Sequence, residues 1–209
     1  MADLNACFIS YSHSPEPGVQ AIYEAFRDAL ATQVGLYLTK VPVYLDIKRL
    51  KGGVLYDQEL PCQLCRSGCM VLLFSPSYFD IENTYCAREY KAMVQLEKMR
   101  LALTDAQVKN EGLIIPVVLR GEEALPDEVK KRQYYNLDRM LLQPADFGSK
   151  ACAEIIKEIA AVIFSRFRAF KRAPAPVPCD SFTLPTDDEI RLWLQEVVDD
   201  APPLKLPHT

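Results

Sequence analysis

The residue whose type and position most directly suggest chemistry is Glu89, in the stretch SPSYFDIENTYCAREY over residues 75–90. The apolar run before it, residues 69–74, is typical of a buried parallel strand, and the stretch ends in a predicted helix. Parallel α/β sheets bind ligands just beyond the carboxyl ends of their strands. Glu89 is therefore predicted to face a ligand crevice, although a solvated glutamate stabilised by the helix dipole would give the same pattern.

Further polar groups are predicted at the ends of three strands on the same edge of the sheet. They are Ser10 and Tyr11, then Asp46, then Ser75 and Ser77. The basic residues of a neighbouring loop are Lys48, Arg49 and Lys51. Hydroxyls and carboxylates suit a ribose, and a basic loop suits phosphate groups. The same loop is also consistent with a simple solvated turn.

Other site chemistries known at parallel sheets lack their residues in this sequence. A phosphoacceptor site needs a carboxylate cluster at the first strand end and an aspartate at the third, but these ends are FISYS and LLFSPS. A dinucleotide site needs GxGxxG after the first strand, and that motif does not occur. The two histidines, His13 and His208, do not lie beside a serine or cysteine in a triad pattern.

Three cysteines, Cys62, Cys65 and Cys69, have the spacing CxxCxxxC. A zinc site needs a fourth ligand and usually paired CxxC spacings, and Cys86 and His13 are not in register. We therefore expect these thiols to pack as small hydrophobic groups, without a bound metal. The chain has seven cysteines, an odd number, which indicates reduced thiols in a reducing compartment.

Length and charge limit the remaining function classes. The chain has 209 residues, enough for one α/β domain and an appendage, and its net charge of −4 argues against a nucleic-acid partner. No apolar stretch approaches the roughly 20 residues of a membrane span. The first residues lack the basic and apolar regions of a secretory signal. We expect a cytoplasmic protein with no membrane partner.

The elements that must position these groups alternate between strands and helices. Strands are predicted over residues 6–11, 41–46, 69–74 and 113–119, and a weak one within 134–142. Helices are predicted over residues 19–38, 57–66 and 149–170, and from a cap at Asn83 or Thr84 to about residue 103. Alternation of this kind predicts an α/β fold with a parallel sheet, and five strands fit the flavodoxin-like, doubly wound order.

The composition changes after residue 170, which divides the chain into a domain over 1–170 and a tail over 171–209. The tail begins with a proline-rich linker at residues 173–178. A capping box from Thr186 to Glu189 then precedes a short helix with one apolar face. The apolar residues are Ile190, Trp193, Leu194 and Val197. This face is predicted to dock on its own domain or on a second subunit, where Trp193 would be the anchor.

Four segments in a fixed order are similar to the motifs of one family. They are FISY at 8–11, YLD at 44–46 with LKGG at 50–53, LLFSPS at 72–77 and YCARE at 85–89. They resemble box 1, the second strand with the BB loop, the third strand and the W-C-x-x-E motif of the TIR (Toll/interleukin-1 receptor) domain family in its bacterial form. The resemblance covers about residues 5–168. Tyr85 stands where tryptophan is usual, and we expect its aromatic packing to be kept.

The resemblance implies an enzyme that cleaves the nicotinamide–ribose bond of NAD+. Family members with this glutamate have that activity, whereas many without it act only as adaptors, so Glu89 is the implied catalytic residue. NAD+ would be the substrate, with no cofactor or metal, and the product would be ADP-ribose or a cyclic ADP-ribose-type signal. The residues that we expect to bind the substrate are Phe8, Ser10, Tyr11, Asp46, Arg49, Lys51, Ser75, Ser77 and Tyr85.

The resemblance also implies partners and a role. Such domains form homo-oligomers through TIR–TIR contacts, which here would include the loop Ile47–Tyr56. In bacteria they commonly serve antiviral defence, either by depleting NAD+ or by making a nucleotide signal that switches on a separate effector protein. Two alternatives stay open. The first is a non-enzymatic TIR adaptor, against which Glu89 argues. The second is an enzyme similar to nucleoside deoxyribosyltransferases, which differs in its substrate.

Overall fold

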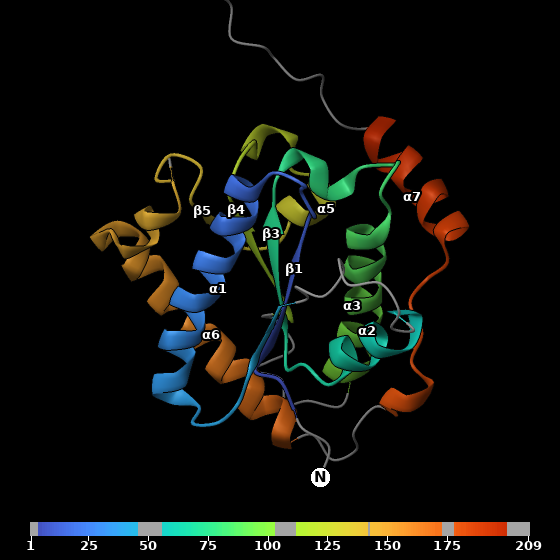
Figure 1. Cartoon of the computed structure of the whole chain (residues 1–209). Helices are drawn as coiled ribbons and strands as arrows, with labels where there is room; N and C mark the ends of the chain where they lie inside the picture. The colour runs from blue at the N-terminus through green and yellow to red at the C-terminus, as the bar shows by residue number, and fades with distance from the viewer. Residues whose placement is uncertain (1–3, 46–55, 103–111, 142, 173–177, 200–209) are drawn as a thin grey trace, which may run out of the picture.

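Five short apolar segments pair into one parallel sheet in the order β2-β1-β3-β4-β5 (Figure 1). The computed structural model describes residues 4–45, 56–102, 112–141, 143–172 and 178–199. The strands are β1 (Cys7–Tyr11), β2 (Val43–Leu45), β3 (Met70–Phe74), β4 (Ile114–Val118) and β5 (Tyr135–Asn136). This is the flavodoxin-like order, so the predicted fold class is confirmed.

The three central strands are buried along their whole length. Every residue of β1, β3 and β4 is buried, which explains why their sequences are continuous apolar runs rather than alternating patterns. In the register between β1 and β3, Ser10 is the partner of Leu72 and Tyr11 the partner of Leu73. This register places the carboxyl ends of the two strands side by side at one edge of the sheet.

Helices cover both faces of the sheet (Figure 1). The α-helices among the described residues are α1 (Pro17–Tyr37), α2 (Tyr56–Cys65), α3 (Tyr85–Leu101), α5 (Asp127–Lys130), α6 (Lys150–Arg172) and α7 (Asp187–Asp199). Short 3-10 helices are η2 (Pro76–Phe79), η3 (Glu122–Ala124), η4 (Pro144–Gly148) and η5 (Cys179–Ser181). Helices α1 and α6 pack together on one face, and α2, α3 and α7 lie on the other. Within the described part of the chain, no helix has the length and apolar character to cross a membrane.

Helix α7 docks on its own domain along α3 (Figure 1). The predicted capping box is present: the Thr186 amide donates to Glu189 Oε2 at 2.8 Å, and the Glu189 amide donates to Thr186 Oγ1 at 3.4 Å. Ile190 is 2% exposed and Leu194 is 0% exposed. The apolar face of the tail is therefore covered by the chain's own α3 side of the sheet; the predicted contact of Val197 lies outside the described side chains.

A disulfide joins Cys65 at the end of α2 to Cys179 at the start of η5, with Cα atoms 5.4 Å apart. The expectation that all cysteines are reduced thiols is wrong for this pair. The two residues are 114 positions apart, so no local spacing indicates that they meet. Cys69 follows the prediction of a buried thiol, and burial raises the pKa of this thiol to about 12, which keeps it protonated.

Candidate active site

Glu89 lies in the second turn of α3, and its side chain is only 2% exposed. Ser10 of β1, itself 1% exposed, donates a hydrogen bond from Oγ to Glu89 Oε2 at 2.5 Å. The two residues meet because β1 lies beside β3, and the chain continues from β3 through η2 into α3. The alternative that Glu89 is a solvated helix residue is therefore wrong.

Tyr78 of η2 completes a buried chain of three polar groups. It is 0% exposed, and its hydroxyl lies 2.5 Å from Ser10 Oγ. Because Ser10 gives its only hydroxyl proton to the carboxylate, Tyr78 must donate to Ser10. Burial raises the pKa of Tyr78 well above its usual value, with further contributions from Cys86 and the charge of Glu89. The phenol therefore keeps its proton at neutral pH and stays a donor.

Sequence reasoning missed Tyr78 as a member of this site. An aromatic residue shortly after a buried strand normally indicates core packing, and the ring of Tyr78 does pack at 4.8 Å from the ring of Phe79. The feature of the sequence that could have identified Tyr78 as a site residue was its hydroxyl group. A buried tyrosine usually finds a hydrogen-bond partner, and the serine of a neighbouring strand end was the nearest candidate.

A second group of hydroxyls lies at the same edge of the sheet. The hydroxyls of Ser75 and Ser77 are 3.2 Å apart, and Ser12 donates from Oγ to the main-chain oxygen of Ser77 at 3.1 Å. These contacts tie the loop after β1 to the loop after β3, so Ser75 and Ser77 lie where the sequence predicted them. Ser12 was missed.

The other two predicted residues of β1 do not lie against Glu89. Phe8 is a core residue at 0% exposure, and its ring stacks on Tyr44 with centroids 5.4 Å apart. Tyr11 follows Ser10 directly, so its side chain points to the opposite face of the sheet. There its ring packs on Tyr23 of α1, with centroids 4.6 Å apart. Of the predicted residues in β1, Ser10 is the one whose hydroxyl donates to the Glu89 carboxylate.

Tyr85, the first residue of α3, is 49% exposed, so the expectation that it keeps the packing of a buried aromatic residue is wrong. The guanidinium carbon of Arg88 lies 5.9 Å from the centre of its ring. The buried aromatic residues here are instead Phe79 of η2 and Tyr90 of α3, whose ring centroids are 5.5 Å apart. The remaining predicted residues, Asp46, Arg49 and Lys51, lie outside the described residues, as does most of the loop Ile47–Tyr56.

Residues of the tail contact the outer side of α3 around the turn that carries Glu89. Thr84 Oγ1 donates to Asp187 Oδ1 at 2.7 Å, and Arg88 Nη1 lies 3.5 Å from the same oxygen. Lys91 Nζ lies 4.0 Å from the centre of the Trp193 ring, a cation–π contact. Thr84 occupies the predicted cap position, but its hydroxyl binds the tail rather than the first turn of its own helix.

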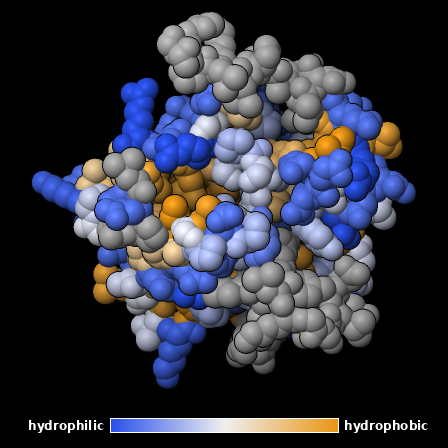
Figure 2. All heavy atoms as spheres, turned by 45° about the horizontal axis from the view of Figure 1, so that its top comes forward, coloured by the Kyte–Doolittle hydropathy of each residue, from blue (hydrophilic) through white to orange (hydrophobic). Residues whose placement is uncertain are grey.

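This arrangement can stabilise a positive charge that develops beside the carboxylate. A carboxylate fixed by a dedicated donor and shielded from water acts more strongly on such a charge than a solvated one does. Figure 2 brings the carboxyl edge of the sheet towards the viewer and shows apolar atoms set back among polar ones. Because Glu89 is 2% exposed, a ligand can touch its carboxylate only after covering groups have moved.

Loss of the Ser10 donor is expected to destabilise the fold. Ser10→Ala leaves a buried carboxylate with one partner fewer, so we expect the free energy of unfolding at neutral pH to fall by about 1–3 kcal/mol. Ser77→Ala is the matched control, because that side chain is exposed, and its effect should stay within about 0.5 kcal/mol. Urea unfolding of both variants measures the difference. Equal, small effects would show that the short contact at Glu89 does not hold the site together.

Comparison with known families supplies an independent result. The family model described as TIR domain matches residues 7–152, which include β1, β3, α3 and β4. A search of curated proteins finds no match to this chain. The matched range contains Ser10, Tyr78 and Glu89, so the buried polar group lies inside the family's own domain.

Proposed function

We propose that this chain, which belongs to the TIR domain family, cleaves the nicotinamide–ribose bond of NAD+ with Glu89 as the catalytic residue. Two facts support the proposal. The family includes NAD-cleaving enzymes, and Glu89 stands in the YCARE segment that resembles the motif carrying their glutamate. The observation that carries it is the buried contact between Ser10 and Glu89, since a buried carboxylate is costly to keep and this one is held by a dedicated donor at the carboxyl edge of the sheet.

The chemistry fits a single carboxylate. Breaking an N-glycosidic bond builds positive charge on the ribose, as in other glycosyl transfers. Glu89 would stabilise that charge and orient the ribose hydroxyls, with Ser10 and Tyr78 holding the carboxylate in place. Nicotinamide is a good leaving group and needs no strong general acid. Water as the acceptor gives ADP-ribose, and a hydroxyl or ring nitrogen of the same molecule gives a cyclic product.

Mass spectrometry of the products after incubation of the full chain with NAD+ tests the proposal. We expect free nicotinamide together with ADP-ribose or a cyclic isomer. A parallel incubation with deoxynucleosides tests the enzyme similar to deoxyribosyltransferases, for which base exchange would be the product. If neither substrate reacts at any protein concentration, the enzymatic proposal is wrong.

A non-enzymatic adaptor is the second candidate, and one observation favours it. Glu89 is 2% exposed, so the described conformation offers no direct access to its carboxylate. An adaptor would act through TIR–TIR assembly alone, and its glutamate would be a structural partner of Ser10. The same coverage is also consistent with an enzyme that opens on assembly, so concentration dependence separates the two candidates.

Assembly is expected to raise activity steeply. We propose homo-oligomers through TIR–TIR contacts that include the Ile47–Tyr56 loop, whose basic residues and Gly52-Gly53 suit contact with a neighbour. The reason is the covered carboxylate, since a neighbouring subunit can stabilise a rearranged, open site. Turnover per subunit, measured across the concentration range of self-association, should be low in the dilute monomer. Turnover per subunit that stays constant across that range would exclude this control.

We further propose that the protein acts in the cytoplasm in bacterial antiviral defence. The enzyme would either deplete NAD+ or make a nucleotide signal that a separate effector protein binds. Membership of the TIR domain family supports this proposed role. The disulfide between Cys65 and Cys179 would be unusual in a reducing compartment, so its state in living cells is a direct check of the location.

A further inference from the structure

A pocket of about 710 Å³ lies away from Glu89, between the C-terminal half of α3, the start of β4 and α6. It exists because β5 is only two residues long and pairs with Val117 and Val118 alone. No described strand therefore covers the outer side of β4 beside Ile114 and Ile115, and both residues line the pocket. Its volume lies in the usual range for small-molecule sites.

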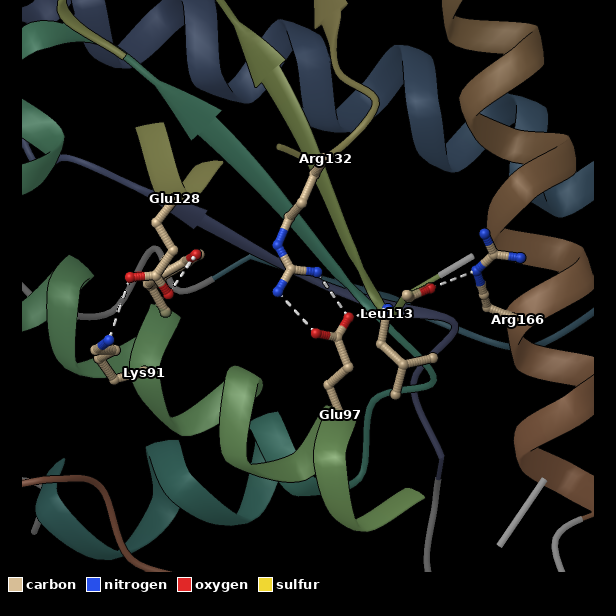
Figure 3. A network of polar contacts seen from close by, with 8 residues as sticks. Lys91, Glu97, Leu113, Glu128, Arg132 and Arg166 are labelled. Atoms are coloured by element: carbon tan, nitrogen blue, oxygen red, sulfur yellow. Dashed lines mark hydrogen bonds and ion pairs between the residues drawn. The ribbon is translucent and has the colours of Figure 1, made fainter. Parts of the chain in front are cut away.

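An ion pair with fixed geometry forms one wall of the pocket (Figure 3). Arg132 donates from both terminal nitrogens to Glu97, at 2.8 Å and 2.7 Å, and the Leu113 amide donates to Glu97 Oε1 at 2.5 Å. Gly112 makes room for this pair: its φ is +67°, and a Cβ there would lie 2.8 Å from Glu97 Oε1. The wall is thus held in place before any ligand arrives.

Cations outnumber carboxylates among the described residues that line the pocket, although the chain as a whole is acidic. The lining holds three cations, Lys131, Arg132 and Arg166, against one carboxylate, Glu97. Arg132 and Glu97 neutralise each other, so Lys131 and Arg166 are the cations of the lining beyond this pair. Arg166 is 7% exposed and donates from Nε to the Gly112 oxygen at 2.7 Å (Figure 3). The exposed Lys131 has no ion-pair partner for its ammonium group among the described residues.

Part of the remaining lining suits a flat aromatic body. The half-buried ring of Tyr135 offers a stacking surface, and Ile114, Ile115 and Val162 supply apolar contacts. We propose that this pocket binds a small anion with a planar aromatic body, of the mononucleotide class. The phosphate lies against Lys131, in a pocket that Arg166 also lines, and the base lies along Tyr135. The proposal does not depend on NAD+ cleavage.

Isothermal titration calorimetry of the full chain with AMP as the probe tests the site. Two variants remove it by different means. Lys131→Glu reverses the exposed charge, and Ala161→Trp fills the pocket from an exposed position of α6. Each is expected to weaken AMP binding about tenfold or more. The matched control is Lys150→Glu, an exposed lysine at the start of the same helix that does not line the pocket, and it should bind AMP as the wild type does.

Two further probes separate the parts of the proposed ligand. Inorganic phosphate and adenosine should each bind more weakly than AMP, because each lacks one of the two contacts. No saturable binding of AMP up to millimolar concentrations would overturn the proposal, and so would binding that both pocket variants leave unchanged. Equal affinity for phosphate and AMP would overturn the contact with Tyr135. Because the readout is binding, failure here leaves the proposed NAD+ cleavage untouched.

Discussion

Replacement of Glu89 by glutamine is expected to lower the rate of NAD+ cleavage about 100-fold or more, the scale of losing a key electrostatic stabiliser. Glutamine keeps the size of the side chain and can still accept the hydrogen bond from Ser10, so the fold should survive. The negative charge that would stabilise the ribose cation is lost. Single-turnover and steady-state rates with NAD+, compared with urea unfolding of the same variant, separate lost chemistry from lost structure.

The matched control for this prediction is Glu82→Gln, an exposed glutamate in the segment that leads into α3. It removes the same charge from the same region without touching the buried group, so its activity should equal that of the wild type. Activity of Glu89→Gln within a few fold of the wild type, in a folded protein, would falsify the catalytic assignment. The buried contact with Ser10 would then be a structural one.

Truncation after Arg172 is expected to cost about 3 kcal/mol or more of unfolding free energy, from lost apolar burial and the lost disulfide together. The tail buries Ile190 and Leu194, and Trp193 packs on Tyr90 with ring centroids 5.9 Å apart. Because these contacts lie within one chain, the oligomeric state should not change. Urea unfolding and light scattering measure the two properties. Unchanged stability with an altered oligomer would show that the tail serves a second subunit instead.

Point variants divide this effect between the helix and the disulfide. Leu194→Ala should cost about 2–5 kcal/mol, because the side chain is fully buried. Leu192→Ala is its control on the same helix, since Leu192 is 66% exposed and should have little effect. Cys65→Ser removes the disulfide alone, with an expected loss of about 2–4 kcal/mol. Reduction of the wild type should reproduce that loss, whereas reduction of Cys65→Ser should change nothing.

The sheet and half of the candidate site could be predicted from the sequence because both depend on local patterns. The apolar runs of β1, β3 and β4 identify buried parallel strands wherever they occur. Ligand sites of parallel sheets lie beyond the carboxyl ends of the strands, and this rule places Ser10 and Glu89 near each other without any knowledge of distances. The strand order followed from the count of five alternating strands, and the register from β1 to β3 agrees with it.

Contacts between distant segments could not be predicted. Cys65 and Cys179 meet because the tail returns across the outer side of α2 and α3, which no short window of sequence encodes. Tyr78 looks like a core aromatic residue, and only the position of Ser10 reveals its hydroxyl as a donor. Tyr85 stands in a motif where the family has a tryptophan, yet as the first residue of α3 it projects outward.

The contact between Thr84 and Asp187 joins residues 103 positions apart, and this has a consequence for how the protein is made. A ribosome adds about 5–20 residues per second, so α7 leaves it roughly 5–20 s after α3. During that interval the outer side of α3 lacks the cover that Trp193 later gives to Tyr90. A nascent chain therefore contains the residues of its sheet and of α3 before it contains those of α7. Any activity that requires α7 to hold α3 and Glu89 in place arises only once residues 187–199 have emerged.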